Sequence, residues 1–334
     1  MYKKILLAST LATILFAGCS SKEYYKPEQT FNLSTSNIGD ELINYSRDGA
    51  TLASGTVLTK DQAIKIKLDK GFYFINNNRN VAITADLQGN CHIVTQKGTV
   101  ASAKFPQALV AGTLIGSYLV YVLQNNNYGI YDFKANKIIY NNEAHKAYAI
   151  DRRIANPLPV DKLVVIPTLD GKLVVLDMTT KKIAKEVFVS TEKSLNNIIF
   201  LGQLNDALIV ATPHKMISLS SKGKKEYDKE IAEVVINGGK VFVFQKNGKI
   251  AKLNESLSVI SEKKFKFAHF SRATVDEKKV YALEKQGYLI VANRNLSKHK
   301  VYKSSEVDDF TFVSGNKIYY NNGEVINLTP LSYK

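Results

Sequence analysis

Short apolar runs separated by turn residues dominate the chain after about residue 40. The runs are five to seven residues long and rich in Val, Ile, Tyr, Phe and Thr, and Gly, Asn and Asp lie between them. Runs of this kind predict β-strands joined by tight turns. We find no convincing amphipathic helix longer than two turns. The pattern therefore predicts an all-β fold.

The runs also repeat as hairpins. In one unit, the strand Lys162 to Thr168 is followed by the turn Leu169 to Gly171 and by the strand Lys172 to Asp177. An Asp-Gly pair favours such a turn because both residues tolerate positive φ. Equivalent turns lie near positions 89, 129, 171, 214, 248, 287 and 323, so the unit recurs at a nearly constant interval along the chain.

The interval averages about 40 residues, which is typical of a β-propeller blade of four strands. We expect a single β-propeller over residues 40–334, with seven blades closed by strands from the N- and C-terminal ends. The hairpin Lys317 to Leu328 has too few strands for a blade, so we expect Glu41 to Tyr45 and Gln62 to Leu68 to complete it. Removal of residues 40–70 should then unfold the domain, whereas removal of residues 20–35 should only shorten a linker.

One unit also carries a family resemblance. The segment Gly171-Lys-Leu-Val-Val-Leu-Asp177-Met-Thr-Thr180 resembles the repeat of pyrroloquinoline-quinone-like (WD40/YVTN-like) propellers. Quinone-dependent enzymes with this repeat have a Trp at a docking position in each blade and a vicinal Cys pair, and they are considerably larger. This chain has no Trp and no such pair. We therefore expect the fold without the enzyme activity and without a cofactor.

The N-terminus has the layout of a bacterial signal peptide. Lys3 and Lys4 precede the apolar run Ile5 to Ala17, which is too short for a permanent membrane span. The end of this run and the next two residues, Phe16-Ala17-Gly18-Cys19, resemble the lipobox of bacterial lipoproteins. We expect a signal peptide at 1–18, lipidation of Cys19 with acyl chains such as palmitate, and a flexible linker at 19–39. The alternative is an ordinary secreted protein with an accidental Cys.

A lipoprotein with such a propeller is similar to the scaffold lipoprotein of the outer-membrane β-barrel assembly machinery. The resemblance implies a non-catalytic scaffold that faces the periplasm from the outer membrane and binds envelope proteins. A secretion or motility apparatus is the second choice of assembly, and the inner membrane or the cell surface are less favoured locations. The rival interpretation is a binder or hydrolase that holds a small molecule or glycan in the propeller channel.

The charge balance is basic, with 45 Lys and Arg against 30 Asp and Glu. The excess lies mainly in residues 151–334, which carry 30 basic and 20 acidic side chains. Lysines gather at three places there. The first is Lys222, Lys224, Lys225 and Lys229, the second is Lys263, Lys264 and Lys266, and the third is Lys298, Lys300 and Lys303. Such clusters favour anionic surfaces. The alternative is a solvated strand face, and we expect no nucleic-acid partner.

The search for catalytic chemistry is nearly empty. The histidines at positions 92, 145, 214, 269 and 299 show no metal-binding spacing. Cys91 has no partner if Cys19 is acylated, and we interpret it as a buried thiol in a strand. We therefore predict no catalytic, cofactor-binding or metal-binding residue, and Cys19 as the single modified site.

Overall fold

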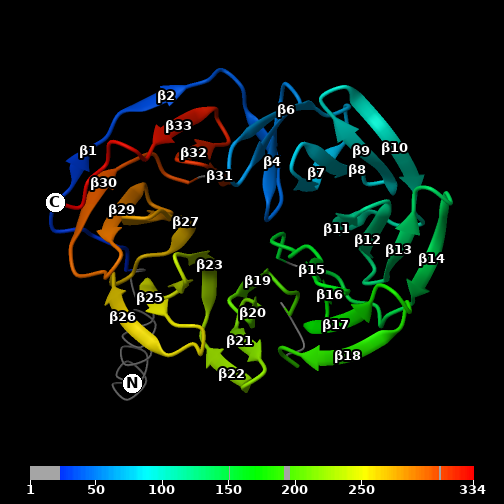
Figure 1. Cartoon of the computed structure of the whole chain (residues 1–334). Coiled ribbons are helices and arrows are strands. Elements are labelled where there is room, and N and C mark those ends of the chain that lie inside the picture. The colour runs from blue at the N-terminus through cyan, green and yellow to red at the C-terminus, as the bar shows by residue number, and fades with distance from the viewer. Residues whose placement is uncertain (1–22, 150, 192–195, 308–309) are drawn as a thin grey trace, which may run out of the picture.

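The computed structural model describes residues 23–149, 151–191, 196–307 and 310–334. These residues form 33 strands in eight sheets, which stand around a central axis as the blades of one β-propeller (Figure 1). Within the described ranges, no helix has the length and apolar character needed to cross a membrane. The all-β propeller predicted from the sequence is confirmed.

The first four blades each contain four consecutive antiparallel strands. Blade 1 consists of β3 (Leu42–Tyr45), β4 (Gly49–Leu52), β5 (Thr56–Thr59) and β6 (Ala63–Lys67). Blade 2 consists of β7 (Tyr73–Asn78), β8 (Val81–Ala85), β9 (Asn90–Thr95) and β10 (Gly98–Lys104). Blade 3 consists of β11 (Leu109–Ile115), β12 (Tyr118–Leu123), β13 (Tyr128–Asp132) and β14 (Lys137–Asn142). Blade 4 consists of β15 (Leu158–Val160), β16 (Leu163–Pro167), β17 (Lys172–Asp177) and β18 (Ile183–Phe188).

The other four blades complete the ring. Blade 5 consists of β19 (Phe200–Leu204), β20 (Ala207–Ala211), β21 (Lys215–Ser220) and β22 (Gly223–Asp228). Blade 6 consists of β23 (Ile231–Asn237), β24 (Lys240–Gln245), β25 (Lys249–Leu253) and β26 (Val259–Lys264). Blade 7 consists of β27 (Phe270–Val275), β28 (Lys279–Glu284), β29 (Tyr288–Asn293), β30 (His299–Lys303) and β1 (Phe31–Asn32). Blade 8 consists of β31 (Thr311–Ser314), β32 (Lys317–Tyr320), β33 (Glu324–Asn327) and β2 (Thr35–Asn37).

The blade number of seven predicted from the sequence is wrong, because the ring has eight blades. The segments expected to complete the last hairpin, Glu41 to Tyr45 and Gln62 to Leu68, instead contain the first and last strands of a separate blade 1. The strand that closes the ring is β2, which pairs antiparallel with β33. Closure between N- and C-terminal strands is therefore as expected, but a different segment performs it.

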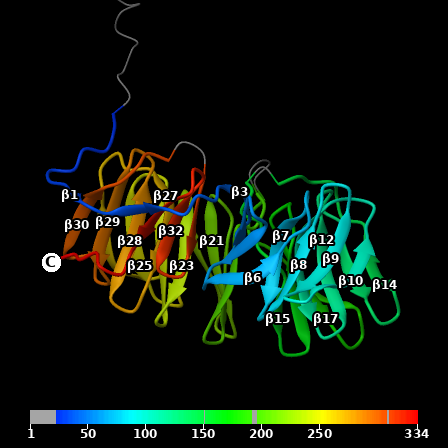
Figure 2. The ribbon, with the colours of Figure 1, turned by 90° about the horizontal axis from the view of Figure 1, so that it is seen from above.

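The N-terminal segment also adds a strand to blade 7. Strand β1 pairs in parallel with β30, with Phe31 opposite Tyr302. Figure 2 shows this segment running along the outside of blades 7 and 8. Both β1 and β2 lie inside residues 19–39, where the sequence suggested a linker. Residues 31–37 are thus part of the ring.

The apolar runs of the sequence are the middle strands of the blades. Each blade packs between two neighbours, so both faces of these strands are buried; β12, for example, is buried at five of its six residues. One apolar cluster joins Val120 and Val122 of blade 3 to Val164 and Val174 of blade 4. The outer strands contact solvent and are polar, as in β22, where the first four of the six residues are exposed.

The glycines of the hairpin turns have a structural role in several blades. Gly248 has a φ of 84° and accepts a hydrogen bond from the amide of Phe265, the residue after the outer strand, at 2.8 Å. A Cβ at this position would lie 2.2 Å from the Phe265 carbonyl oxygen. The carbonyl groups of Gly89, Gly171 and Gly287 accept equivalent bonds. These turns therefore tie the outer strand of a blade to its middle hairpin and need glycine.

Candidate functional site

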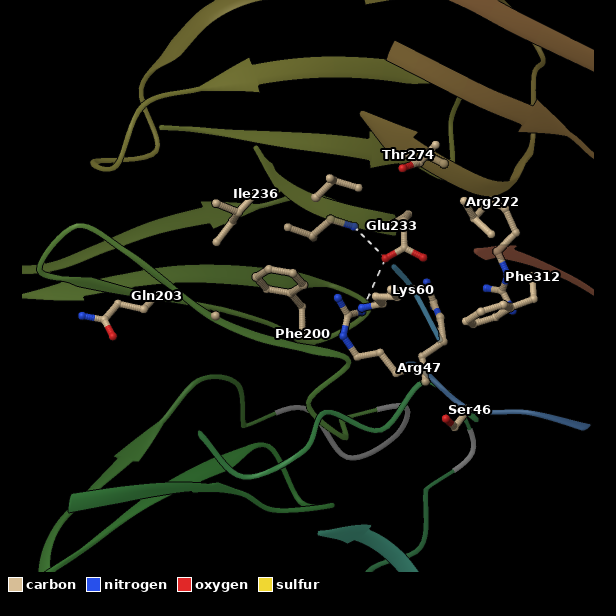
Figure 3. Close-up of a pocket in the computed structure, with 16 residues that line it drawn as sticks. Ser46, Arg47, Lys60, Phe200, Gln203, Glu233, Ile236, Arg272, Thr274 and Phe312 are labelled. Carbon is tan, nitrogen blue, oxygen red and sulfur yellow. Dashed lines mark hydrogen bonds and ion pairs between the residues drawn. The ribbon is translucent and has the colours of Figure 1, made fainter. Parts of the chain in front are cut away.

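The centre of the ring contains a cavity of about 430 Å³. Its wall includes residues of the innermost strands β19, β23, β27 and β31, together with loop residues of blade 1 and the segment before β15. Figure 3 shows the side chains that point into this space. Seven charged residues gather in and beside the cavity, and we call them the channel cluster: Arg47, Asp48, Lys60, Asp151, Arg153, Glu233 and Arg272.

Arg47 and Glu233 form the middle of the channel cluster. The Arg47 Nη1 lies 3.4 Å from the Glu233 Oε1 and donates to the carbonyl oxygen of Ile199 at 2.7 Å. The guanidinium also lies over the ring of Phe200, 4.5 Å from its centroid. Burial alone would raise the pKa of Glu233, but the nearby charges of Arg47, Arg153, Arg272 and Lys60 hold it below its usual range. Glu233 is therefore a carboxylate at neutral pH.

Asp48 and Lys60 form a second pair. The Lys60 Nζ lies 2.7 Å from the Asp48 Oδ1, and the Asn156 amide donates to Asp48 Oδ2 at 2.7 Å. Burial opposes the charge of Asp48, yet Lys60 and Arg47 lower its pKa. Burial and the Arg47 charge lower the pKa of Lys60. The Lys60 side chain lies inside the ring, yet it is 47% exposed because it borders the central cavity.

The remaining members join further blades. Arg153 pairs with Asp151 and donates to the carbonyl oxygen of Ala232. Arg272 donates through Nε to the carbonyl oxygen of Thr311 at 2.7 Å and lies over the ring of Tyr45. The cluster has four cations and three carboxylates, and the contacts of Arg47 with Glu233 and of Arg153 with Ala232 join blades that meet only across the channel. It can tie the blades together and present polar groups to a ligand.

The channel shows no catalytic arrangement among its described lining residues. None of the described residues that line the central cavity is His or Cys, and His269 lines only the adjoining cavity beside Arg272. The hydroxyl of Ser46 bonds locally to Gly49. Within the described ranges, no three His, Cys, Asp or Glu side chains are grouped closely enough to hold a metal ion. The carboxylates that are present already have cationic partners. The arrangement supports binding and structural roles.

An apolar patch lies next to the channel. It borders a cavity of about 550 Å³ that shares Ser46 with the channel cavity. Three large side chains there are strongly exposed: Ile43 at 57%, Leu87 at 73% and Tyr148 at 64%. They come from blade 1, the turn between β8 and β9, and the connection from blade 3 to blade 4. We call these three residues the apolar patch. Exposed apolar groups of this size that lie together mark surfaces for protein contact.

The first two predicted lysine clusters lie at the outer edges of neighbouring blades. Lys222, Lys224 and Lys225 belong to the edge of blade 5, where Lys224 pairs with Glu226 at 2.6 Å. Lys263 and Lys264 lie at the end of β26 in blade 6 and border a separate groove of about 970 Å³. The sequence identified both clusters but could not show which lysines are paired.

Of the two cysteines, Cys91 lies within the described residues and Cys19 does not. Cys91 is a buried thiol in β9, as predicted, and burial raises its pKa to about 12. Cys19, the predicted lipidation site, lies outside the described residues. Histidines lie on separate parts of the ring, with His214 beside Glu230 at 2.5 Å and His92 stacked on Phe72.

The channel cluster and the apolar patch were not predicted. A signal was available in the sequence, since Glu233 and Arg272 are the single charged residues of the strands β23 and β27. A charge at this position would be costly in a strand buried on both faces. It therefore indicates that the strand borders the channel. Leu87 lies within a turn where polar residues are usual, which is the corresponding signal for the patch.

No protein-family model matches the chain. The plasminogen-binding protein PgbB of Helicobacter pylori strain J99 is 24% identical over an alignment of 368 residues, which covers 94% of this chain and 68% of PgbB. PgbB of strain 26695 is likewise 24% identical, with 67% of its length covered. The chain is thus similar over almost its whole length to proteins named for binding another protein.

Solved structures show the same fold. BamB from Moraxella catarrhalis has a TM-score of 0.64 and 14% identity, covering 89% of this chain and 98% of BamB. The C-terminal WD40 domain of Sif2 has a TM-score of 0.63 and 12% identity, with the same coverage. The predicted similarity to the lipoprotein propeller of the barrel-assembly machinery is confirmed for the fold.

Proposed function

We propose that the protein is a non-catalytic scaffold that binds another envelope protein through the apolar patch beside its channel. It is anchored to the outer membrane by a lipid on Cys19 and faces the periplasm. Outer-membrane protein assembly is the first choice of process, and a secretion or motility apparatus is the second. The observation that carries the proposal is the joint exposure of Ile43, Leu87 and Tyr148 on one side of a rigid ring.

The comparisons support a role in protein binding. PgbB is named for binding plasminogen, and BamB is a lipoprotein propeller of a barrel-assembly complex. The paired carboxylates of the channel also favour a scaffold over a hydrolase, since a general acid or base needs a free group within reach of a substrate.

The test is purification of the lipidated protein from detergent-solubilised envelopes, followed by mass spectrometry of the proteins that accompany it. Leu87→Ser together with Tyr148→Ser should reduce the recovery of the main partner at least about tenfold, because exposed apolar anchors dominate such interfaces. Val100→Ser is a matched control, since Val100 is 60% exposed on the outer strand β10. The proposal fails if the double variant recovers the partner as well as the control does.

The relatives favour a second candidate function, which is binding of plasminogen at the cell surface. The observation in its favour is the match to PgbB over 94% of the chain. Immobilised protein and purified plasminogen test it directly by surface plasmon resonance. Saturable binding that survives the Leu87→Ser and Tyr148→Ser changes would place this activity away from the apolar patch.

A further inference from the structure

The N-terminal segment is fixed to the propeller earlier than a linker would be. Tyr25 is only 7% exposed and packs edge-on against the rings of Phe265 and Tyr288, with centroid distances of 6.2 and 5.7 Å. Burial, followed by the charge of Glu284, raises the pKa of its hydroxyl to about 12. From Tyr25 the chain continues along the rim to β1 and β2. The chain is therefore already packed against the propeller at Tyr25.

This docking limits how far the ring can lie from a lipid on Cys19. Tyr25 is six positions after Cys19. A fully extended chain spans at most about 3.5 Å per residue, so this stretch reaches about 20 Å. A linker of twenty residues would reach several times farther. The rim of blades 6 and 7 must then lie close to the membrane that holds the anchor.

The surface at this place is strongly basic. A groove of about 970 Å³ runs between the N-terminal segment, the end of β26, the start of β30 and the C-terminal residues. We call it the rim groove. Glu28 supplies the one carboxylate side chain among its described lining residues, which include seven lysines: Lys26, Lys263, Lys264, Lys266, Lys298, Lys300 and Lys334.

The charge of these lysines is not balanced by acidic neighbours within the part of the chain that the structure describes. None of the seven forms an ion pair with a described residue, and the ammonium groups of Lys266 and Lys300 instead lie over the rings of Phe267 and Phe31. Elsewhere on the ring, lysines pair with glutamates, as at Lys215, Lys224 and Lys249. The rim groove therefore presents a positive charge where the anchor holds the ring.

We propose that the rim groove binds the anionic phospholipid headgroups of the membrane in which the Cys19 lipid is inserted. The short connection brings the groove to the surface, and its ammonium groups match the headgroup phosphates. The ring then stands with blades 6 and 7 toward the bilayer. The orientation of the ring at the membrane rests on the proposed lipid anchor, whereas the binding of anionic headgroups in the groove does not.

The test uses the unlipidated chain without residues 1–18, carrying Cys19→Ser, in flotation with vesicles. Vesicles of phosphatidylcholine with phosphatidylglycerol as the minor, anionic component should bind the protein, and pure phosphatidylcholine should not. The variant Lys263→Gln, Lys266→Gln, Lys298→Gln should bind the anionic vesicles at least about tenfold more weakly. Lys222→Gln, Lys224→Gln, Lys225→Gln removes the same charge from blade 5 and should lose much less.

Other outcomes would overturn the proposal. An equal loss for the two triple variants would show a response to net charge alone, and binding that inorganic phosphate removes at constant ionic strength would show a site for free phosphate. Absence of vesicle binding, together with loss of an envelope protein in the Lys263, Lys266 and Lys298 variant, would make the groove a protein interface. The scaffold proposal can fail independently, because it is tested by the Leu87→Ser and Tyr148→Ser variant of the apolar patch. Identical thermal melting of all variants serves as the folding control.

Discussion

The channel cluster and the rim groove both gather positive charge, but they use it differently. In the channel, four cations face three carboxylates, and Arg47 is only 7% exposed as it contacts Glu233. In the rim groove, seven lysines share one carboxylate side chain among the described lining residues, and most of them are exposed to solvent. The cations of the channel are therefore balanced by nearby carboxylates, whereas the lysines of the rim groove are exposed and mostly unbalanced.

The difference shows which charges remain available for a partner. A buried cation whose carboxylate is removed loses a large stabilising interaction, so the channel cluster is tied to the fold. An exposed lysine is solvated and contributes little to folding, so it can bind an outside anion at small cost to the ring. The N-terminal segment has both a structural role and a place in the rim groove, because β2 closes the propeller and Phe31 lines the groove.

The largest effect should come from removing this segment. Deletion of residues 23–37 removes β1 and β2, leaves blade 8 with three strands and exposes the edge of β33. Open sheet edges are unfavourable, and the N-terminal and C-terminal blades lose their link. We expect the midpoint of thermal unfolding to fall by at least about 10 °C, measured by circular dichroism.

The matched control is deletion of residues 1–18, which removes none of the described residues and should leave the melting curve unchanged. Limited proteolysis should then cleave the 23–37 deletion rapidly and the control slowly. Equal stability of the two proteins would contradict closure of the ring by β2. It would restore the original expectation that this region is only a linker.

Neutralising a carboxylate should destabilise the protein more in the channel cluster than on the exposed edge of a blade. Glu233→Gln removes the carboxylate that faces Arg47 and leaves the cations of the channel without their central partner. We expect the free energy of unfolding at pH 7 to fall by about 3 kcal/mol, the cost of breaking a buried pair. Urea unfolding measures it. Glu226→Gln is the control, because Glu226 pairs with Lys224 and Lys215 on the exposed edge of blade 5. If both variants lost a similar amount of unfolding free energy, the conclusion that the channel charges are tied to the fold would be contradicted.

Acid should weaken the channel cluster in a defined range. The pKa values of Asp48, Asp151 and Glu233 are lowered in the folded state by the neighbouring cations, against the effect of burial. Their stabilisation is therefore present above the unfolded-state values, near pH 4, and is lost as the pH falls through the lower folded-state values. We expect unfolding free energy to fall below about pH 4, and the difference between Glu233→Gln and the unchanged chain to shrink there.

Much of the fold could be predicted from local pattern. Asp170-Gly171 and the other turns mark the hairpins, and their spacing predicts the blades. The blade number was wrong because β2 is only three residues long, and its burial pattern is fully exposed. Such a strand has no apolar signal, since it exists through backbone pairing with β33. Blade 1 was consequently interpreted as the missing closure.

The sites were less accessible to prediction because they combine distant residues. Arg47 and Glu233 are 186 positions apart, and only ring closure brings them together. The basic excess was visible at Lys263 and Lys264, whereas the shortage of acidic neighbours could be seen only in the structure. Tyr25 carries no mark in the sequence that distinguishes it from Tyr24, although one is buried and the other exposed.

The smallest predicted effect concerns a buried carboxylate without a Lys or Arg ion pair among the described residues. Glu284 is fully buried at the end of β28, accepts amide hydrogen bonds from His269 and Gln286, and has a pKa raised by burial. Because the folded-state pKa is raised, the contribution of Glu284 to stability is complete at low pH and is lost as the pH rises through that pKa.

Gln245 occupies the equivalent position in blade 6, before the turn at Gly248, and is also buried. Glu284→Gln should therefore raise the melting temperature at pH 7 by about 2 °C and leave it unchanged at pH 4. Lower stability of Glu284→Gln at pH 7 would show that the two amide hydrogen bonds accepted by the carboxylate outweigh the cost of burying its charge.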